Sequence, residues 1–255
     1  MLRLAEVEIR PAHRGEFRVL VAAQAAGLGQ LRGYLVADLL RRYAERTGLA
    51  PTVIDLLPAR EAALRAACDK LNIHPPQHTM TEPFDLGQLA GQFPDGIREP
   101  VFDVGVRAAG EAISPAAGDQ AGQWIEVAGA SGSETAEGEE PGLGEEPLAV
   151  RLTLMRQEYG EKLAGDLSPR DGADGDLTRW RELVARWARS PSGAMSRRHA
   201  DAITAAFEDG LDTAAGLREL AVLAGDDGVP DGVKFETFAA ADRLFGLDLA
   251  RDVGR

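Results

Sequence analysis

The segment from Val19 to Tyr43 constrains the fold of this chain more than any other part of the sequence. It starts with an apolar run, continues through a loop of small residues that contains Gly27 and Gly29, and ends with apolar residues at helical spacing. The helical positions are Leu31, Leu35, Leu39 and Tyr43. This order predicts a β-strand, a tight loop and an α-helix in succession.

A unit of this kind can bind phosphate, because the first backbone N–H groups of a helix point outward and carry partial positive charge. The small residues of the loop would let an anion approach closely. The chain contains neither a complete GxGxxG pattern nor a complete GxxxxGK[ST] pattern. A simple packing turn therefore stays open as the alternative to a phosphate site.

The residues after this loop resemble a known family. Arg32–Val53, RGYLVADLLRRYAERTGLAPTV, is similar to the segment that follows the HIGH signature of cysteinyl-tRNA synthetases and of the related mycothiol cysteine ligases. Alignment of the two places HIGH on Gly27, Leu28, Gly29 and Gln30. One glycine is kept, and both histidines are absent. The resemblance implies a vestigial nucleotide-binding site at these four residues.

Two further segments carry the resemblance. Ala66–Thr79 resembles the helix and double-proline turn before the family's central insertion, and Ala206–Arg255 resembles its helical bundle. The likeness covers most of Phe17–Thr79 and Pro147–Arg255, whereas Glu82–Glu146 matches only in fragments. It implies an α/β plus α fold, in which a partial class I synthetase (Rossmann-like) domain is followed by a C-terminal helical bundle.

The zinc site of the family is the first departure, because such a site needs thiolate and imidazole ligands. The strand that carries the family's first cysteine reads Val19–Ala22 here, and the only cysteine is Cys68. Cys68, His74 and His78 could be read as a metal cluster. We favour a buried thiol and two surface imidazoles instead, and we expect no metal site and no zinc.

The basic KMSKS loop of the family is the second departure. Its lysines stabilise the charge that develops on ATP during adenylation, and its place falls near Gln123–Leu152. No Lys or Arg occurs between Arg107 and Arg151, and glutamates accumulate there instead. These would repel a triphosphate. The sequence therefore predicts no catalytic residues for ATP activation by the family's route.

A third departure is deletion. The residues from Glu82 to Ala121 are too few for the family's full insertion and its second nucleotide-binding half. A cofactor crevice in an open α/β sheet lies between two halves, at the point where the strand order reverses. We therefore expect an incomplete crevice.

The chain is expected to have three parts: a reduced Rossmann-like synthetase domain (1–122), an acidic flexible loop (123–147) and an α-helical bundle of at least four helices (148–255). In the first part, we expect strands at Ala5–Arg10, Val19–Val21, Pro51–Leu56 and Val101–Val106 and a helix at Ala59–Leu71. In the bundle, Ser196 and Thr213 are the expected N-caps and Gly246 is the expected C-cap. Two apolar stripes at helical spacing indicate buried faces, at Leu148, Leu152, Met155 and Tyr159 and at Leu177, Trp180, Val184 and Trp187.

Composition bounds the class of protein. The chain has 255 residues, of which 44% are hydrophobic, and this suffices for real cores. One cysteine excludes a disulfide framework. No apolar stretch is long enough for a membrane span, and the N-terminus lacks the apolar region of a signal peptide. We expect a soluble, cytoplasmic protein without a membrane partner.

The net charge of -13 argues against tRNA as a partner, because binding a polyanion relies on Lys and Arg. Arginines do cluster at two expected helices. The larger cluster comprises Arg179, Arg181, Arg186 and Arg189. We interpret such faces as solvated surface.

The sequence favours a binding or regulatory pseudoenzyme, a cysteinyl-tRNA synthetase-like protein that has lost ATP-dependent cysteine activation. Its partner is a protein or small ligand that the sequence does not identify, and no cofactor is expected. One alternative is an active ATP-dependent cysteine ligase, of the aminoacyl-tRNA or mycothiol type, with a divergent site in which Gly27 and Gly29 hold the adenosine. A gene product without selected activity is the other.

Overall fold

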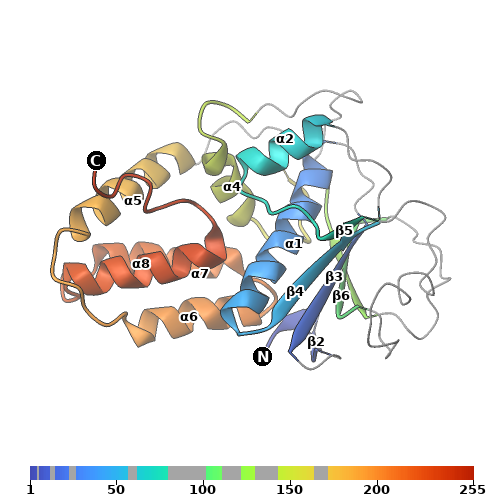
Figure 1. Ribbon diagram of the computed structural model, residues 1–255, viewed down its shortest axis with the longest axis horizontal. Coiled ribbons are helices and arrows are strands. Elements are labelled where there is room, and N and C mark those ends of the chain that lie inside the picture. The colour runs from blue at the N-terminus through green and yellow to red at the C-terminus, as the bar shows by residue number, and fades with distance from the viewer. Residues whose placement is uncertain are drawn as a thin grey trace. The chain divides into compact units, whose positions relative to one another are not determined.

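The computed structural model describes residues 1–4, 6–11, 15–22, 27–56, 62–79, 102–110, 122–129, 143–163 and 172–255 (Figure 1). The chain divides into two compact units. The first comprises Arg3–Gly142 and Tyr159–Asp166, and the second comprises Leu143–Glu158 and Leu167–Arg255. The chain therefore does not pass from one unit to the other only once, near residue 147, because residues 159–166 belong to the first unit again.

A five-stranded parallel sheet forms the framework of the first unit. In spatial order its strands are β5 (His78–Thr79), β4 (Ala50–Asp55), β3 (Glu16–Ala22), β6 (Val104–Ala108) and β7 (Gln123–Val127). Numbered along the chain, this is the order 3-2-1-4-5 of a Rossmann-like sheet. Strands flank β3 on both sides, so the strand order reverses at β3. The incomplete crevice stays a prediction, since residues 23–26, 57–61, 80–101 and 111–121 lie outside the described part.

Helix α1 (Leu28–Arg46) runs alongside β3, β4 and β6 (Figure 1). The predicted stripe from Leu31 to Tyr43 is at most 5% exposed, and most other residues of the helix are buried as well. Packing on several faces stabilises such a helix more than its intrinsic propensity does. The β-strand and the α-helix predicted for Val19–Tyr43 are confirmed, and residues 23–26 of the loop lie outside the described part. No described helix has the length and apolar character needed to cross a bilayer.

A buried ionic network attaches α1 to the turn before β5. Arg42 Nε donates to Asp38 Oδ2 at 2.7 Å, and Arg42 Nη2 donates to the carbonyl oxygen of Asn72 at 2.8 Å. The backbone N–H of His74 donates to Asp38 Oδ1 at 3.2 Å, and His74 Nδ1 lies 2.8 Å from the same oxygen. The turn that follows α2 (Ala62–Lys70) is thereby held against α1.

The prediction of a single N-terminal strand at Ala5–Arg10 is wrong. The chain makes a two-stranded antiparallel hairpin instead, from β1 (Arg3–Leu4) and β2 (Val7–Glu8). Glu6 has a positive φ of 66°, which interrupts any extended run through this segment.

Strand β7 corrects the expected limit of the acidic loop, since residues 123–127 pair with β6. The indole of Trp124 lies against Gly105 so closely that a Cβ there would come within 2.3 Å of the ring. Phe102 meets the same ring edge to face, with centroids 5.1 Å apart. A short strand followed by Gly and Glu carries little periodicity, which is why sequence assigned it to the loop. Residues 130–142 lie outside the described part.

The second unit is helical, as expected. Its described helices are α4 (Pro147–Met155), α5 (Ala173–Trp187), α6 (Arg197–Glu208), α7 (Thr213–Gly225) and α8 (Asp231–Phe245). Helix α8 packs against α5, α6 and α7. Phe238 of α8 meets the rings of Trp180 and Trp187 edge to face at 6.3 and 5.1 Å. The two tryptophans of the second predicted stripe are therefore buried in the core of this unit.

The predicted cap at Gly246 is confirmed, since Gly246 ends α8 in the left-handed conformation. Ser196 occupies the N-cap position of α6, but its side chain makes no capping hydrogen bond. The cap of α7 is Asp212 and not Thr213, because the Asp212 side chain accepts the N–H of Ala215 at 2.7 Å. The Thr213 hydroxyl instead donates to the carbonyl oxygen of Met155 at 2.6 Å.

The first apolar stripe predicted for the bundle is shorter in the structure than the sequence suggested. Leu148, Leu152 and Met155 are buried in α4, but the helix ends at Met155. Tyr159 consequently lies beyond the helix and belongs to the first unit.

Two buried arginines hold the C-terminal segment of the second unit. Arg151 Nε donates to the carbonyl oxygen of Phe245 at 2.6 Å. Arg181 donates to the carbonyl oxygens of Leu247 and Asp248 at 3.0 and 3.1 Å, and to Glu146 Oε2 at 2.9 Å. Burial by itself raises the pKa of Glu146, but its hydrogen bonds and charge interactions with Arg181 and Arg251 lower this pKa below its ordinary value of 4.5.

The Glu146→Gln substitution should lower the thermal stability at neutral pH. Because the pKa of Glu146 is depressed in the folded protein, its ion pairs stabilise the fold above pH 4.5 and are lost as pH falls through the lower folded value. The carboxylate is partly exposed, so water screens the pairs and we expect a loss of no more than about 1 kcal/mol, or about 2–4 °C in Tm.

Calorimetric melting at neutral and acidic pH checks this expectation. Glu145→Gln, which removes the same charge from an exposed neighbour, is the matched control. An equal Tm for both variants at neutral pH would contradict the anchoring role of Glu146.

Candidate functional site

The carboxyl ends of β3 and β6 lie side by side at the point where the strand order reverses. Strand β3 pairs with β4 on one side and with β6 on the other, and all three run in the same direction. In open parallel sheets, ligands bind in the crevice outside the carboxyl ends of the strands at this point. The geometry therefore makes the junction of β3 and α1 the candidate site.

Helix α1 begins at the same edge of the sheet. Gly27 is its N-cap and has a φ of 67°, a conformation that favours glycine, and as a glycine it supplies no side-chain cap. The N–H of Leu31 donates to the carbonyl oxygen of Gly27 at 3.2 Å. The N–H groups of Leu28, Gly29 and Gln30 come before this bond, at the helix positions that bind anions in other proteins.

The four residues identified from the sequence therefore lie together at the start of α1. Leu28 and Gly29 are buried, and Gln30 is half-buried. Their location agrees with a phosphate-binding turn, and their role in nucleotide binding stays a prediction.

A buried carboxylate ends β4 at this edge. Asp55 is fully buried, and its two oxygens accept the hydroxyl of Tyr34 at 3.0 and 3.1 Å. Because Tyr34 belongs to α1, this interaction fixes the helix on the sheet. Sequence reasoning did not identify Asp55 as a site residue, although an acidic residue at the end of an apolar strand was a usable signal.

Arg32 of α1 is the second buried polar group near the site, with only 1% of its surface exposed. Its Nη1 donates to the carbonyl oxygen of Ala128 at 3.1 Å and to that of Glu161. Burial lowers the pKa of Arg32 to about 10, and the charge of Glu161 opposes this shift. The guanidinium is therefore still charged at neutral pH and is engaged by main-chain oxygens.

These bonds attach a returning segment, Tyr159–Leu163, to the end of β7. The N–H of Ala128 donates to the carbonyl oxygen of Tyr159 at 2.8 Å, and the N–H of Leu163 donates to that of Gly129 at 3.2 Å. The exposed side chain of Lys162 belongs to this segment. The returning segment thus brings a lysine to the carboxyl edge of the sheet, which sequence reasoning did not foresee.

Arg107 lies near the carboxyl end of β6. Its Nη2 donates to Glu126 Oε1 of β7 at 2.6 Å, and its guanidinium lies 5.9 Å from the centre of the Trp124 ring. Its Nε is buried and has no hydrogen-bond partner within the described part of the chain. Glu126 therefore largely neutralises the charge that Arg107 would offer to an anion.

The three residues considered as a metal cluster have different environments. Cys68 is buried in α2, and His78 is exposed. His74 is bound through Nδ1 to Asp38, so it is not the simple surface imidazole that was expected. Across the described ranges, no three His, Cys, Asp or Glu side chains lie close enough to hold a metal ion.

Comparison with solved structures finds 14 matching chains, and the one described here is a distant likeness. A chain from Campylobacter jejuni, whose crystal structure is described as a "putative arginyl t-RNA synthetase", is similar with a TM-score of 0.49 and 11% sequence identity. The likeness covers 91% of this chain and 92% of that chain. No protein-family model and no curated protein matches the sequence. A likeness at this level assigns neither an activity nor a substrate.

We predict that the purified protein holds no stoichiometric zinc. The thiol of Cys68 is buried and the Nδ1 of His74 is bound to Asp38, so these side chains are not free to converge on an ion. Elemental analysis after dialysis against a weak chelator checks this. One equivalent of retained zinc would contradict the prediction, and its loss on Cys68→Ser would locate the ligand.

Proposed function

We propose that the chain is a binding or regulatory protein on a synthetase-like scaffold, and that it does not activate cysteine with ATP. The observation that carries the proposal is the engagement of two guanidinium groups that the structure describes near the candidate site. Arg32 is bound to two carbonyl oxygens, and Arg107 is paired with Glu126. Neither guanidinium is available to a triphosphate unless it breaks these bonds.

The chemistry of adenylation makes this engagement decisive. Charge develops on the phosphates as pyrophosphate leaves, and positioned donors must stabilise it. Removal of one such donor typically costs about 10² to 10³ in rate. The family's histidines and lysines are absent from the matching positions of this chain, so several losses combine.

The binding half of the proposal rests on the start of α1. Its first N–H groups, at Leu28–Gln30, lie at the switch point of the five-stranded parallel sheet. Backbone donors of this kind can hold a phosphate-bearing ligand without promoting chemistry. We infer a small ligand or a protein partner in the cytoplasm, and we infer no tRNA because the net charge of -13 opposes a polyanion.

An active ATP-dependent cysteine ligase is the second candidate, and Lys162 is the observation that favours it. This exposed lysine lies in the returning segment at the carboxyl edge of the sheet. A lysine there could supply the cation that the sequence lacks between Arg107 and Arg151. Lys162 is therefore the residue to substitute if the protein shows activity.

Cysteine-dependent exchange of pyrophosphate into ATP should stay at background. The expected reason is the absence of donors that stabilise the developing charge. The full chain is assayed beside a cysteinyl-tRNA synthetase as the positive control. Calorimetry with ATP, with and without cysteine, reports binding separately from chemistry.

Exchange above background would overturn the proposal and identify a ligase. In that case Lys162→Gln and Gly29→Pro should abolish exchange if the candidate site is the active site. Lys70→Gln, a lysine of α2, is the matched control for the first variant. Exchange that survives both changes would move the active site away from the junction of β3 and α1.

A further inference from the structure

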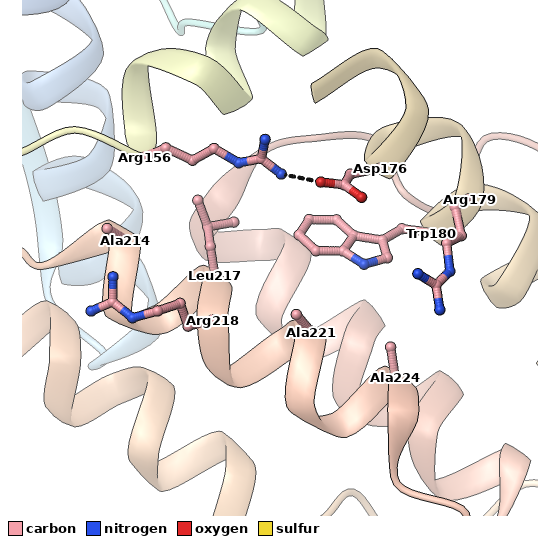
Figure 2. A pocket seen from close by; sticks show the side chains of 9 residues that line it. All are labelled: Arg156, Asp176, Arg179, Trp180, Ala214, Leu217, Arg218, Ala221 and Ala224. Atoms are coloured by element: carbon pink, nitrogen blue, oxygen red, sulfur yellow. Dashed lines mark hydrogen bonds and ion pairs between the residues drawn. The ribbon is translucent and has the colours of Figure 1, made fainter. Parts of the chain in front are cut away.

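The helical unit contains a cavity of about 280 Å³ that is separate from the candidate site (Figure 2). Helices α5 and α7 and the residue that ends α4 line it. Three arginines face this cavity, Arg156, Arg179 and Arg218, together with the single carboxylate of Asp176. The cavity therefore combines concave shape with an excess of positive charge.

The cavity follows from the sequence of α7. Ala214, Leu217, Ala221 and Ala224 are spaced three and four residues apart, so they share one face of the helix. Three of the four side chains are methyl groups, which leave space in front of α7. Figure 2 shows the indole of Trp180 projecting from α5 toward this face, between Arg156 and the alanines.

The arginines differ in how they are paired. Arg156 Nη2 lies 2.5 Å from Asp176 Oδ2, so these two side chains form a tight ion pair. The side chain of Arg218 is 70% exposed, and its Nη2 lies 3.9 Å from Asp212 Oδ2, which makes this a loose ion pair. Arg179 is exposed, and no carboxylate of the described residues forms an ion pair with it. Two guanidiniums are therefore available to a ligand.

This arrangement contradicts the interpretation of the arginine cluster on α5 as uniform solvated surface. Arg181 is 2% exposed and holds the C-terminal segment, whereas Arg179 lines the cavity. Arg186, two turns further along, is exposed and does not line it. The same residue type thus has three different roles within one helix.

We propose that this cavity binds a small phosphate-bearing molecule with an aromatic or apolar body. Guanidinium groups donate paired hydrogen bonds to phosphate oxygens, and an indole beside Leu217 offers an apolar wall. The volume is close to the lower limit of small-molecule sites, about 300 Å³, which suits a ligand of about mononucleotide size. Nucleic acid is disfavoured, because the net charge of -13 repels a polyanion beyond the cavity.

The test uses the full chain and three probes: adenosine monophosphate, pyrophosphate and glucose 6-phosphate. Binding is measured by calorimetry, with adenosine as the probe that lacks phosphate. We expect one molecule of adenosine monophosphate per chain, and weaker binding of pyrophosphate and glucose 6-phosphate, which lack an aromatic body. The double variant Arg179→Gln, Arg218→Gln should weaken this binding by at least about tenfold, because charge-assisted hydrogen bonds are lost.

Arg186→Gln is the matched control, since it removes the same charge from an exposed position on the same helix. It should leave the affinity unchanged. The lining arginines Arg179 and Arg218 are exposed, so an unchanged Tm confirms that the double variant folds.

Three outcomes would overturn the proposal. They are no binding of any phosphate probe, equal binding by the double variant, and equal binding of adenosine. Loss of binding on Gly29→Pro alone would assign the phosphate to the candidate site of the first unit. Binding of a single-stranded oligonucleotide in place of the small probes would identify a nucleic-acid surface.

Discussion

The burial of α1 against the parallel sheet is the constraint on which the first unit depends. This helix carries Asp38 and Arg42 into a buried environment, where each charge needs a partner. The turn at His74 supplies partners at one end, and Asp55 accepts from the Tyr34 hydroxyl nearer the other end. The polar groups of α1 therefore help to fix its position on the sheet.

The same constraint shapes the candidate site. Arg32 is buried because α1 is buried, and its charge is met by the carbonyl oxygens of Ala128 and Glu161. The residue that could have been a phosphate ligand becomes a structural anchor for the returning segment. In the second unit, Arg151 and Arg181 act in the same way on the C-terminal segment. The arginines that can still bind ligands are those whose side chains remain exposed to solvent.

Sequence reasoning succeeded where the signal was local and failed where partners were distant. The periodicity from Leu31 to Tyr43 identified α1, and Gly246 marked the end of α8. Strands β5 and β7 were missed, because short strands acquire their identity from neighbours in the sheet. Asp212 replaced Thr213 as the cap since both residue types suit that position and tertiary contact with Met155 engaged the threonine.

By itself, the sequence determined that this protein has an α/β segment built around Val19–Tyr43 and a helical C-terminal part, because apolar spacing and glycine positions act over a few residues. Only the tertiary structure decided that β6 and β7 complete the sheet, that Arg107 is paired with Glu126, and that Arg179 faces a cavity. These features join residues far apart along the chain or depend on which helix face is covered. Burial and charge pairing across such distances are set by packing, which local patterns do not contain.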